Sequence, residues 1–257
     1  MISRYNVWLN GVSLAGINPQ IYVSDISYRA VEINRNNAHR AGNHGTYRGN
    51  EYIESLHVDV LFQIESYGTA ERQELLQQVA AWARKGGWLE TSDRPYKRLY
   101  VVCDVYPSIN SAMRWLDTIT MTFSAYELPF WQEKIPNTVS VTAAADTDGS
   151  AELFCPGYFP ANLEAEITPG ASIETLSISV AGKTMTFDGL TGAGKIKISY
   201  TDDRNILTVT QGDTSVLDKR TAASADDLPL VPGEYNTVTV HGSAALSAVF
   251  RVRGLTL

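Results

Sequence analysis

A short glycine-rich segment gives the first chemical candidate, a phosphate-binding loop. Residues 189–195 read Gly-Leu-Thr-Gly-Ala-Gly-Lys, which matches the first seven positions of the P-loop pattern. The eighth position is Ile196, so the hydroxyl group that would hold magnesium is missing. The residues after it alternate as in a strand, whereas a phosphate site needs the N-terminus of a helix. The pattern therefore predicts a hairpin turn and no nucleotide site.

Two histidines suggest a second kind of chemistry, a metal or anion site. His39 and His44 lie five positions apart in a segment rich in Gly and Asn, close to Arg40 and Arg48. Metal sites combine His with Cys or carboxylate ligands, and this segment has neither. The acidic run 146–149 lacks the further ligands of a calcium loop and is more simply a turn. We predict no metal site and no cofactor.

The placement of nucleophiles, bases and carboxylates argues against an enzyme. The histidines at positions 39, 44, 57 and 241 are scattered, and no Ser or Cys has the local sequence of a nucleophile elbow or a catalytic triad. The carboxylate pairs Asp202-Asp203 and Asp226-Asp227 fall in expected turns, where charged side chains meet water. We therefore predict no catalytic residue and no enzymatic activity.

A carbohydrate-binding module is an alternative that the sequence leaves open. Sugar sites rely on an aromatic platform, most often Trp, but all five Trp residues precede position 132. The remaining candidates, Tyr158, Phe159, Tyr200 and Tyr235, are dispersed. A host-surface adhesin with a carbohydrate-binding β-sandwich is therefore the second hypothesis.

Composition and charge limit the partners and indicate two domains. The chain has 257 residues and a net charge of −7, which argues against a nucleic-acid-binding surface. Residues 1–131 hold 12 Lys and Arg against 13 Asp and Glu, whereas residues 132–257 hold 9 against 15. Aromatic residues show the opposite bias, since 18 of 25 precede position 132. Two parts with such different chemistry predict two domains.

The cysteines and the N-terminal sequence indicate the compartment in which the chain folds. Cys103 and Cys155 stand in apolar surroundings in different halves, which favours two free buried thiols over a disulfide. No signal peptide opens the chain, and no apolar run approaches the roughly 20 residues that cross a membrane. We expect a protein that is made and folds in a cytoplasm and has no membrane partner.

One helix is expected to organise the first domain. Six residues fall at helical spacing and form one apolar stripe: Leu75, Leu76, Val79, Ala80, Trp82 and Ala83. Thr69 is placed to cap the start, and Arg84 and Lys85 precede a Gly-Gly pair that is typical of a helix end. Because isolated helices of this length are marginal, the predicted helix 69–85 must cover a partner surface, and the flanking strands are the obvious partner.

The rest of the first domain has the pattern of strands. Asn10-Gly11 between two apolar runs predicts a tight hairpin. Further strands are predicted at residues 21–33, 56–64, 98–106 and 115–124. The fold class is therefore mainly β with one α-helix, and residues 1–131 are predicted to form a β-sandwich or split barrel with the helix packed on it.

A proline-rich boundary separates this domain from the second. Five residues are interpreted as an interdomain hinge, because proline stiffens the connection and the aromatic side chains can wedge the domains together: Leu128, Pro129, Phe130, Trp131 and Pro136. From residue 137 onward, short apolar runs are separated by turn dipeptides, with a polar loop at 221–227. The regular spacing predicts an antiparallel β-sandwich over residues 132–257.

Several short motifs follow one another in an order that resembles a known family. The N-terminal half has Val-Trp-Leu-Asn-Gly-Val at 7–12, Arg-Ala-Gly-Asn-His-Gly at 40–45, Trp-Leu at 88–89, Ser-Asp-Arg-Pro at 92–95 and Leu-Pro-Phe-Trp at 128–131. The C-terminal half has Pro-Gly at 169–170 and Leu-Val-Pro-Gly-Glu-Tyr-Asn at 230–236. In order and spacing, nearly the whole chain resembles the distal tail proteins (Dit) of siphophages, which form the hub of the tail tip or baseplate.

The resemblance implies a virion structural protein with a ring-forming N-terminal domain and a galectin-like C-terminal sandwich. Six copies would form a hub between the major tail tube protein and the tail-associated or tail-tip hub protein, and would hold receptor-binding or baseplate proteins. DNA would pass through the central channel. The galectin-type sugar motif is absent, so galectin-like would describe shape only. A ring from a bacterial secretion machine is a further alternative.

A closed ring needs one patch that meets a different patch on the neighbouring copy. Residues 35–50 form an arm with almost no apolar side chain, which costs entropy unless a partner orders it. We therefore predict a subunit interface at the following residues: Arg35, Arg40, His44, Tyr47 and Arg48. Since basic and acidic residues nearly balance in the first domain, DNA is expected to pass without being bound specifically.

Overall fold

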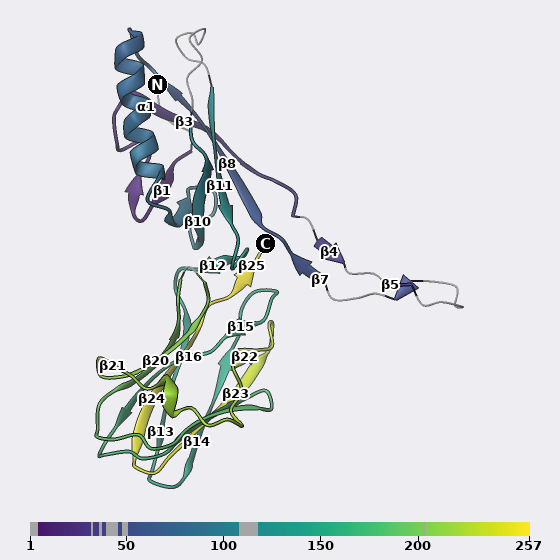
Figure 1. Cartoon of the computed structure of the whole chain (residues 1–257), viewed down its shortest axis with the longest axis vertical. Coiled ribbons are helices and arrows are strands. Elements are labelled where there is room, and N and C mark those ends of the chain that lie inside the picture. The colour runs from purple at the N-terminus through teal and green to yellow at the C-terminus, as the bar shows by residue number, and fades with distance from the viewer. Residues whose placement is uncertain are drawn as a thin grey trace. The chain divides into compact units, whose positions relative to one another are not determined.

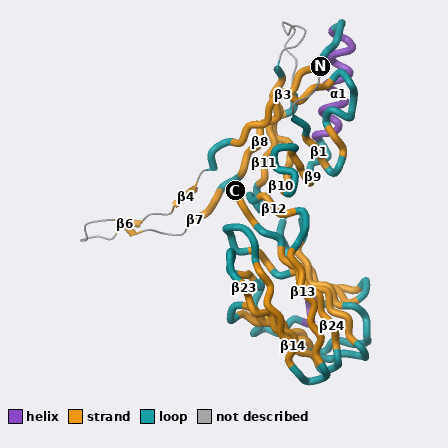
Figure 2. The backbone as a smooth tube through the Cα atoms, turned by 180° about the vertical axis from the view of Figure 1, so that it is seen from behind, coloured by secondary structure: helices purple, strands orange, loops and turns teal. Residues whose placement is uncertain are grey.

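The computed structural model describes residues 5–31, 33–35, 38–39, 46–47, 51–107, 118–202 and 204–257. The chain divides into an N-terminal unit, residues 1–131 with Leu257, and a C-terminal unit, residues 132–256. Strands dominate both units, and the single α-helix of the described part belongs to the first (Figures 1 and 2). The predicted class, mainly β with one helix, is confirmed. None of the described helices is long and apolar enough to cross a membrane.

The N-terminal unit is built on an antiparallel sheet with the strand order β2-β1-β9-β10-β11-β8-β3. The strands have these bounds: β1 Val7–Leu9, β2 Val12–Ser13, β3 Ile21–Tyr28, β8 Leu56–Ile64, β9 Gly87–Thr91, β10 Lys97–Val105 and β11 Ile119–Ala125. Along β8 every second side chain is buried, as its alternating sequence requires. The predicted hairpin at Asn10-Gly11 is confirmed, because β1 pairs with β2 across it.

The helix α1, Thr69–Ala83, covers one face of this sheet (Figure 1). Five residues of the predicted stripe are buried: Leu75, Leu76, Val79, Trp82 and Ala83. They join the core with the buried side chains of β8 and β11. Trp82 meets Phe123 edge to face, with ring centroids 6.0 Å apart. The prediction of a helix that covers a sheet is confirmed.

The ends of α1 differ from the prediction. The residue before Thr69 is the N-cap, so Thr69 is the first helical residue and does not cap the start. The carboxylate of Glu71 instead accepts a hydrogen bond from the backbone N–H of Tyr67 at 3.1 Å. The helix ends at Ala83, two residues early, and Gly86, with φ of 57°, supplies the left-handed residue that was expected there.

The arm at 35–50 has part of its backbone in paired strands. The pairs are antiparallel and consist of β4 Ile33–Arg35 with β7 Glu51–Ile53, and β5 Ala38–His39 with β6 Thr46–Tyr47. Figure 1 shows β4, β5 and β7 lying away from the sheet of this unit. The predicted interface residues Arg40, His44 and Arg48 lie outside the described residues, and Arg35 and Tyr47 are described by their backbone alone.

Two antiparallel sheets form most of the C-terminal unit, which confirms the predicted strand architecture. The larger sheet has the order β13-β24-β16-β19-β20-β21, with β13 Asn137–Ala143, β16 Glu164–Pro169, β19 Ile196–Tyr200, β20 Leu207–Gln211, β21 Thr214–Ser215 and β24 Leu246–Val252. The smaller has the order β14-β23-β17-β18, with β14 Asp148–Phe154, β17 Leu176–Val180, β18 Lys183–Phe187 and β23 Tyr235–Gly242. Alternate residues of β23 and β24 are buried, so each sheet turns one face to the core.

The sequence analysis missed several short elements. Besides β21 and the short strands of the arm, these include β12 Trp131–Glu133, β15 Ala161–Asn162, β22 Pro229–Leu230, β25 Leu255–Thr256 and the 3-10 turn η1 Leu217–Lys219. The strand β9 was missed as well. The first three residues of the predicted strand 115–124 lie outside the described residues, and the described part begins as a strand at Ile119.

The P-loop-like segment 189–195 is a connection between the two sheets. It joins β18 of the smaller sheet to β19 of the larger one, so the prediction of a hairpin turn is wrong. The prediction of a strand after it is confirmed by β19.

The polar loop at 221–227 covers the outer edge of β18. The backbone N–H of Thr221 donates to the Thr186 carbonyl at 2.9 Å, and that of Ala225 donates to the Thr184 carbonyl at 2.8 Å. A free edge can pair with another chain, so this loop blocks a site of aggregation.

Both cysteines are free thiols. Cys103 lies half-buried on β10, and Cys155 is buried just after β14. Burial raises the pKa of Cys103 to about 11 and also raises the pKa of Cys155. Both therefore stay protonated at neutral pH.

Candidate assembly surfaces

The described residues offer little for metal chemistry. None of the described His, Cys, Asp and Glu side chains form a group of three that could hold a metal ion. Asp146, in the run that superficially resembled a calcium loop, has φ of 55° in the turn between β13 and β14. Asp148 begins β14 and lies 2.9 Å from the imidazole of His241. Of the paired carboxylates, Asp226 and Asp227 form surface ion pairs, with Arg220 and Lys183 respectively.

A hydrogen-bonded series on the sheet of the N-terminal unit brings together serine, histidine and aspartate. The Oγ of Ser55 lies 2.8 Å from Nε2 of His57, and Nδ1 of His57 lies 2.6 Å from the Oγ of Ser124. Ser124 in turn donates to the carboxylate of Asp104. Since the Ser124 proton goes to Asp104, its oxygen accepts from Nδ1–H of His57, and Nε2 accepts from Ser55. Sequence analysis missed this series, because its members come from three separate segments.

The order of this series differs from that of a catalytic triad. In a triad the carboxylate bonds the imidazole directly and holds the tautomer that accepts the serine proton. Here Ser124 stands between Asp104 and His57, and Ser124 is 1% exposed. The series ties β8, β10 and β11 together across one face of the sheet, and its hydrogen bonds satisfy the hydroxyl of Ser124, the one buried member.

A charged cluster strengthens the same face. Arg29 forms two hydrogen bonds of 2.9 Å with the two carboxylate oxygens of Asp59, and Thr122 donates to Asp59 at 2.6 Å. Burial of Asp59 by itself would raise its pKa, but the hydrogen bonds from Arg29 and Thr122 and the charge of Arg29 outweigh it. The pKa of Asp59 therefore lies below its ordinary value.

The segment interpreted as an interdomain hinge is largely packed. Pro129 and Trp131 are buried, whereas Leu128, Phe130 and Pro136 are half-buried. Trp131 belongs to the core of the N-terminal unit. In the described part of the chain, the indole N–H of Trp131 has no hydrogen-bond partner, so apolar contact and edge-to-face packing hold the ring.

A cation between two rings secures Trp131. The guanidinium of Arg94 lies 4.3 Å from the ring centroid of Tyr28 and 5.0 Å from that of Trp131. The two rings meet edge to face at 5.8 Å, and the Tyr28 hydroxyl donates to Asp93 at 2.7 Å. Burial is the main cause that raises the pKa of Tyr28, so the hydroxyl remains a donor.

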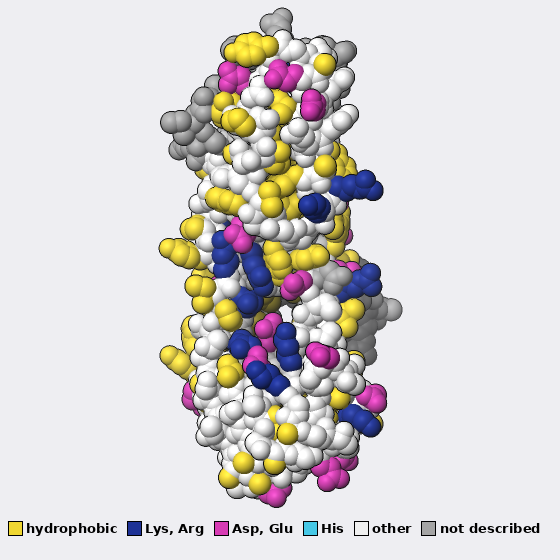
Figure 3. Space-filling view, turned by 90° about the vertical axis from the view of Figure 1, so that its left-hand side faces the viewer, with side chains coloured by type: hydrophobic (Ala, Val, Ile, Leu, Met, Phe, Trp, Pro, Cys, Tyr) yellow, Lys and Arg dark blue, Asp and Glu magenta, His cyan; other side chains and the backbone are white. Residues whose placement is uncertain are grey.

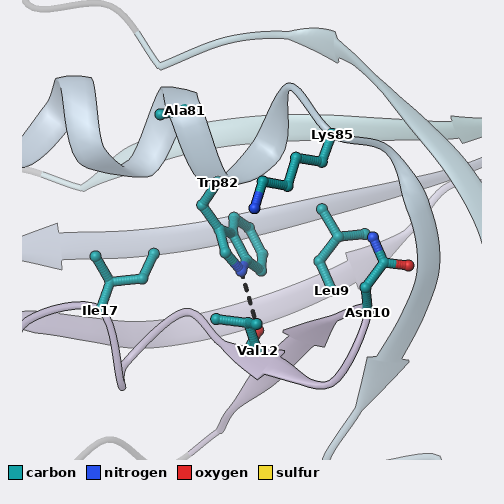
Figure 4. A pocket seen from close by; sticks show the side chains of 7 residues that line it. All are labelled: Leu9, Asn10, Val12, Ile17, Ala81, Trp82 and Lys85. Atoms are coloured by element: carbon teal, nitrogen blue, oxygen red, sulfur yellow. Dashed lines mark hydrogen bonds between the residues drawn. The ribbon is translucent and has the colours of Figure 1, made fainter.

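A recess lies between α1 and the β1–β2 hairpin, and we call it the helix-end recess (Figure 4). Its volume is about 410 Å³, within the range of ligand pockets. Leu9, Val12, Ile17 and Trp82 supply apolar walls, and Val12 is 53% exposed. The indole N–H of Trp82 donates to the carbonyl of Val12 at 3.0 Å and so holds the hairpin against the helix.

The rim of the helix-end recess is fixed by a hydrogen-bonded turn and carries one cation. The side-chain amide of Asn10 donates to the Gly86 carbonyl at 2.7 Å, and its oxygen accepts from the backbone N–H of Trp88 at 3.0 Å. Figure 4 shows the Lys85 side chain extending from the end of the helix toward Trp82. These hydrogen bonds hold the hairpin and the end of the helix together around the recess, which is open to solvent.

The C-terminal unit exposes aromatic side chains of the kind that a sugar site uses. Tyr158 is 82% exposed and Tyr235 is 72% exposed. Phe154 lies opposite Tyr235 in the β14–β23 pair, with ring centroids 5.2 Å apart. Burial raises the pKa of Tyr200 to about 12, and Tyr200 is only partly exposed. Phe154 was not among the candidates from sequence, because only the strand register shows its partner.

Comparison with known proteins finds solved structures with a similar fold. No family model matches the chain, and no curated protein matches it by sequence. Among solved structures, the SPP1 Dit protein, described as a paradigm of the hub adsorption apparatus in phages that infect Gram-positive bacteria, is similar with a TM-score of 0.69. It shares 12% sequence identity, and the match covers 97% of this chain and 98% of that one.

Chains of a phage baseplate are also similar. A chain of the phage p2 baseplate in its activated conformation with Sr has a TM-score of 0.54 at 10% identity, and the match covers 97% of both chains. A chain of the same baseplate with Ca has a TM-score of 0.53 at 9% identity, covering 99% of this chain and 98% of that one. The predicted resemblance is thus confirmed at the level of the fold, and the chain has, through both of its units, the fold of the SPP1 Dit hub protein.

Proposed function

We propose that this chain is a structural virion protein, the hub at the distal end of a non-contractile phage tail. One observation carries the proposal: the similarity to the SPP1 Dit protein extends over 97% of this chain and 98% of that one, so both units and their order are shared. In this function six copies form a ring around a channel through which DNA passes. The ring joins the tail tube to the tail-tip proteins and is located in the virion after assembly in the host cytoplasm.

The two units take different roles in this proposal. The N-terminal unit, with nearly balanced charge, forms the ring and meets the major tail tube protein and the tail-tip hub protein. The acidic C-terminal unit, which has 15 Asp and Glu against 9 Lys and Arg in residues 132–257, is proposed as a galectin-like module that docks receptor-binding or baseplate proteins. The segment from Leu128 to Pro136 is proposed as the hinge between them.

The ring itself is the direct test. Negative-stain imaging and light scattering of the full chain, alone and with tail-tube and tail-tip proteins, should show six-fold rings and a hexameric mass. A chain that remains monomeric in all of these mixtures contradicts the proposal. Six-fold rings do not by themselves separate the hub from the secretion-machine alternative. Finding the chain in phage particles would favour the hub, and its absence from any virion would favour the secretion machine.

The arm is proposed as one contact between neighbouring copies, through Arg35, Arg40, His44, Tyr47 and Arg48. Deleting residues 37–48 removes β5 and β6 but leaves the β4–β7 pair to close the hairpin. The deletion is expected to reduce the mass measured by light scattering. An unchanged oligomer of the deleted chain would exclude this contact.

The proposed hub carries out no reaction. The series of Ser55, His57, Ser124 and Asp104 is proposed as a structural network, because Asp104 bonds Ser124 and the histidine lacks a direct carboxylate partner among the described residues. Replacing Ser55 by Ala should leave any background hydrolysis of activated esters unchanged.

A carbohydrate-binding adhesin is the second candidate, favoured by the exposure of Tyr158 and Tyr235. Binding of the full chain to a glycan array, lost in both Tyr158→Ala and Tyr235→Ala, would support it. Array binding without ring formation would replace the hub proposal, whereas array binding by a ring would assign a second activity to the C-terminal unit.

A further inference from the structure

The two ends of α1 carry complementary features. At the C-terminal end lies the helix-end recess, which has apolar walls and is open to solvent. At the N-terminal end stands Tyr67, which is 88% exposed and lies between the end of β8 at Ile64 and the start of the helix at Thr69. The hydrogen bond from the Tyr67 backbone to Glu71 fixes this residue to the first turn of the helix. An exposed aromatic side chain and an apolar recess thus lie at opposite ends of one element.

The charges at the two ends also differ in sign. Glu71 and Glu74 lie in the N-terminal part of α1, where the one cation, Arg72, donates to Ser66 of the same chain at 3.0 Å, whereas Arg84 and Lys85 follow the last turn. Figure 3 shows this face of the N-terminal unit, with magenta acidic side chains at its upper end and dark blue basic ones lower down. Opposite charges placed around an apolar contact favour one orientation and reject the reverse one.

The size of the recess suits an aromatic side chain. A protein cavity of about 150 Å³ holds benzene. The helix-end recess, at about 410 Å³, has room for a phenol ring and part of its backbone. The carbonyl of Val12 already accepts from Trp82, and the rim residue Lys85 offers a donor to the phenol oxygen.

We propose that Tyr67 of one copy inserts into the helix-end recess of the next copy, with Glu71 and Glu74 facing Arg84 and Lys85 of that neighbour. The proposal rests on the proposed ring and identifies one of its subunit contacts. Two different patches at opposite ends of an element make a head-to-tail interface, which closes into a ring when the rotation between copies allows it. Tyr67 cannot reach the recess of its own chain, because 14 helical residues span about 21 Å.

Cross-linking can test this contact directly. The variants Gly68→Cys and Ala81→Cys, which leave Tyr67 in place, are combined in a Cys103→Ser background and treated with a bismaleimide shorter than the intramolecular span of about 20 Å. Position 81 lines the recess, and Cys155 is buried. A covalent ladder that stops at six copies is expected. Each single-cysteine variant serves as the control and should not extend beyond dimers.

The outcomes separate this contact from the ring. Six-fold rings that give no ladder overturn the contact and leave the hub standing. A ladder that continues beyond six copies supports the contact and contradicts the hexamer. If the chain gives neither rings nor a ladder, both are overturned.

A charge reversal gives an independent measurement without new cysteines. Lys85→Glu should weaken association at least tenfold in light-scattering titrations, and Glu74→Lys in the same chain should restore part of the loss. Gln77→Glu also adds one negative charge, on an exposed position of α1 outside the recess; it is the control and should have no such effect. If Lys85→Glu and Gln77→Glu behave alike, the contact is overturned.

Discussion

The side chain of Asn10 connects three segments of the N-terminal unit. It sits in the left-handed region, with φ of 51°, and bonds both Gly86 after the helix and Trp88 in β9. The Asn-Gly dipeptide indicates this turn from sequence, because both residues tolerate positive φ. The two long-range hydrogen bonds could not be predicted, since their partners lie more than 70 positions further along the chain.

Replacing Asn10 by Ala should lower the free energy of unfolding by more than the cost of placing Ala at a left-handed backbone position. Both side-chain bonds are lost, and each such bond contributes about 1 kcal/mol. Asn205→Ala is the matched control, since Asn205 has nearly the same φ of 52°. Urea unfolding of both variants should show an excess loss of about 2 kcal/mol for Asn10→Ala. Equal losses would mean that the two bonds contribute nothing.

Asp59 should make stability depend on pH in one direction. Its pKa is lower in the folded chain than in the unfolded one, so its contribution is present above about pH 4 and is lost as the pH falls through the folded value. At pH 7, Asp59→Asn is expected to be less stable by about 1–3 kcal/mol, because Arg29 and Thr122 lose a charged acceptor. Unfolding measured at pH 7 and pH 3 should show this gap narrowing. A gap of constant size would contradict the assignment.

At the scale of elements, the periodicity of apolar residues correctly predicted the long strand β8 and the helix α1. The nine residues of β8 and the stripe of α1 are long enough to show a period of two and of 3.6. The five-residue β9 begins at Gly87, the second of the two glycines that follow the helix, so it offered no separate pattern. Periodicity also gives no pairing partner, which is why the connection at 189–195 was predicted as a hairpin although it crosses between sheets.

The helix-end recess could not be predicted for the same reason: periodicity does not show which segments of the chain meet. Its wall combines the hairpin at Val12 with Trp82 of α1, and the two residues are 70 positions apart. Sequence identified Trp82 as a residue of the apolar stripe, but the stripe predicts burial and not the recess beside it. The arm could be predicted from composition alone, because the lack of apolar side chains is a local property.

The loop over the edge of β18 should protect a particular amide from exchange. The Oγ of Ser224 accepts from the backbone N–H of Thr186 at 2.8 Å and donates to its carbonyl at 2.9 Å. In Ser224→Ala, hydrogen exchange of the Thr186 amide should accelerate at least tenfold, while the amides of β17 remain protected. Ser215→Ala, on the exposed strand β21, is the control. Unchanged exchange at Thr186 would show that the loop does not seal this edge.

At the scale of the whole chain, the distribution of charge bears on whether DNA would be bound or would only pass through the proposed channel. A surface that holds duplex DNA needs an excess of Lys and Arg to neutralise phosphates. Residues 1–131 carry 12 basic against 13 acidic side chains, and residues 132–257 are more acidic still. The proposed channel thus belongs to a protein whose net charge of −7 opposes DNA retention.

The full chain is therefore expected to retain no duplex DNA on a filter at physiological salt, even at micromolar protein. A basic DNA-binding protein in the same assay provides the positive control. Retention of DNA at micromolar protein would contradict a channel that lets DNA pass freely. Loss of that retention at higher salt would indicate that Lys and Arg side chains contact the phosphates.

The two protected thiols have a practical consequence for a particle exposed to air. With a pKa near 11, only about one Cys103 side chain in ten thousand is a thiolate at pH 7, and the thiolate is the form that oxidants attack. Cys155 is shielded by complete burial. Storage without a reducing agent should leave both sulfurs intact for long periods. A single surface cysteine added elsewhere would then take up a maleimide dye almost alone, so each copy could be labelled once and counted.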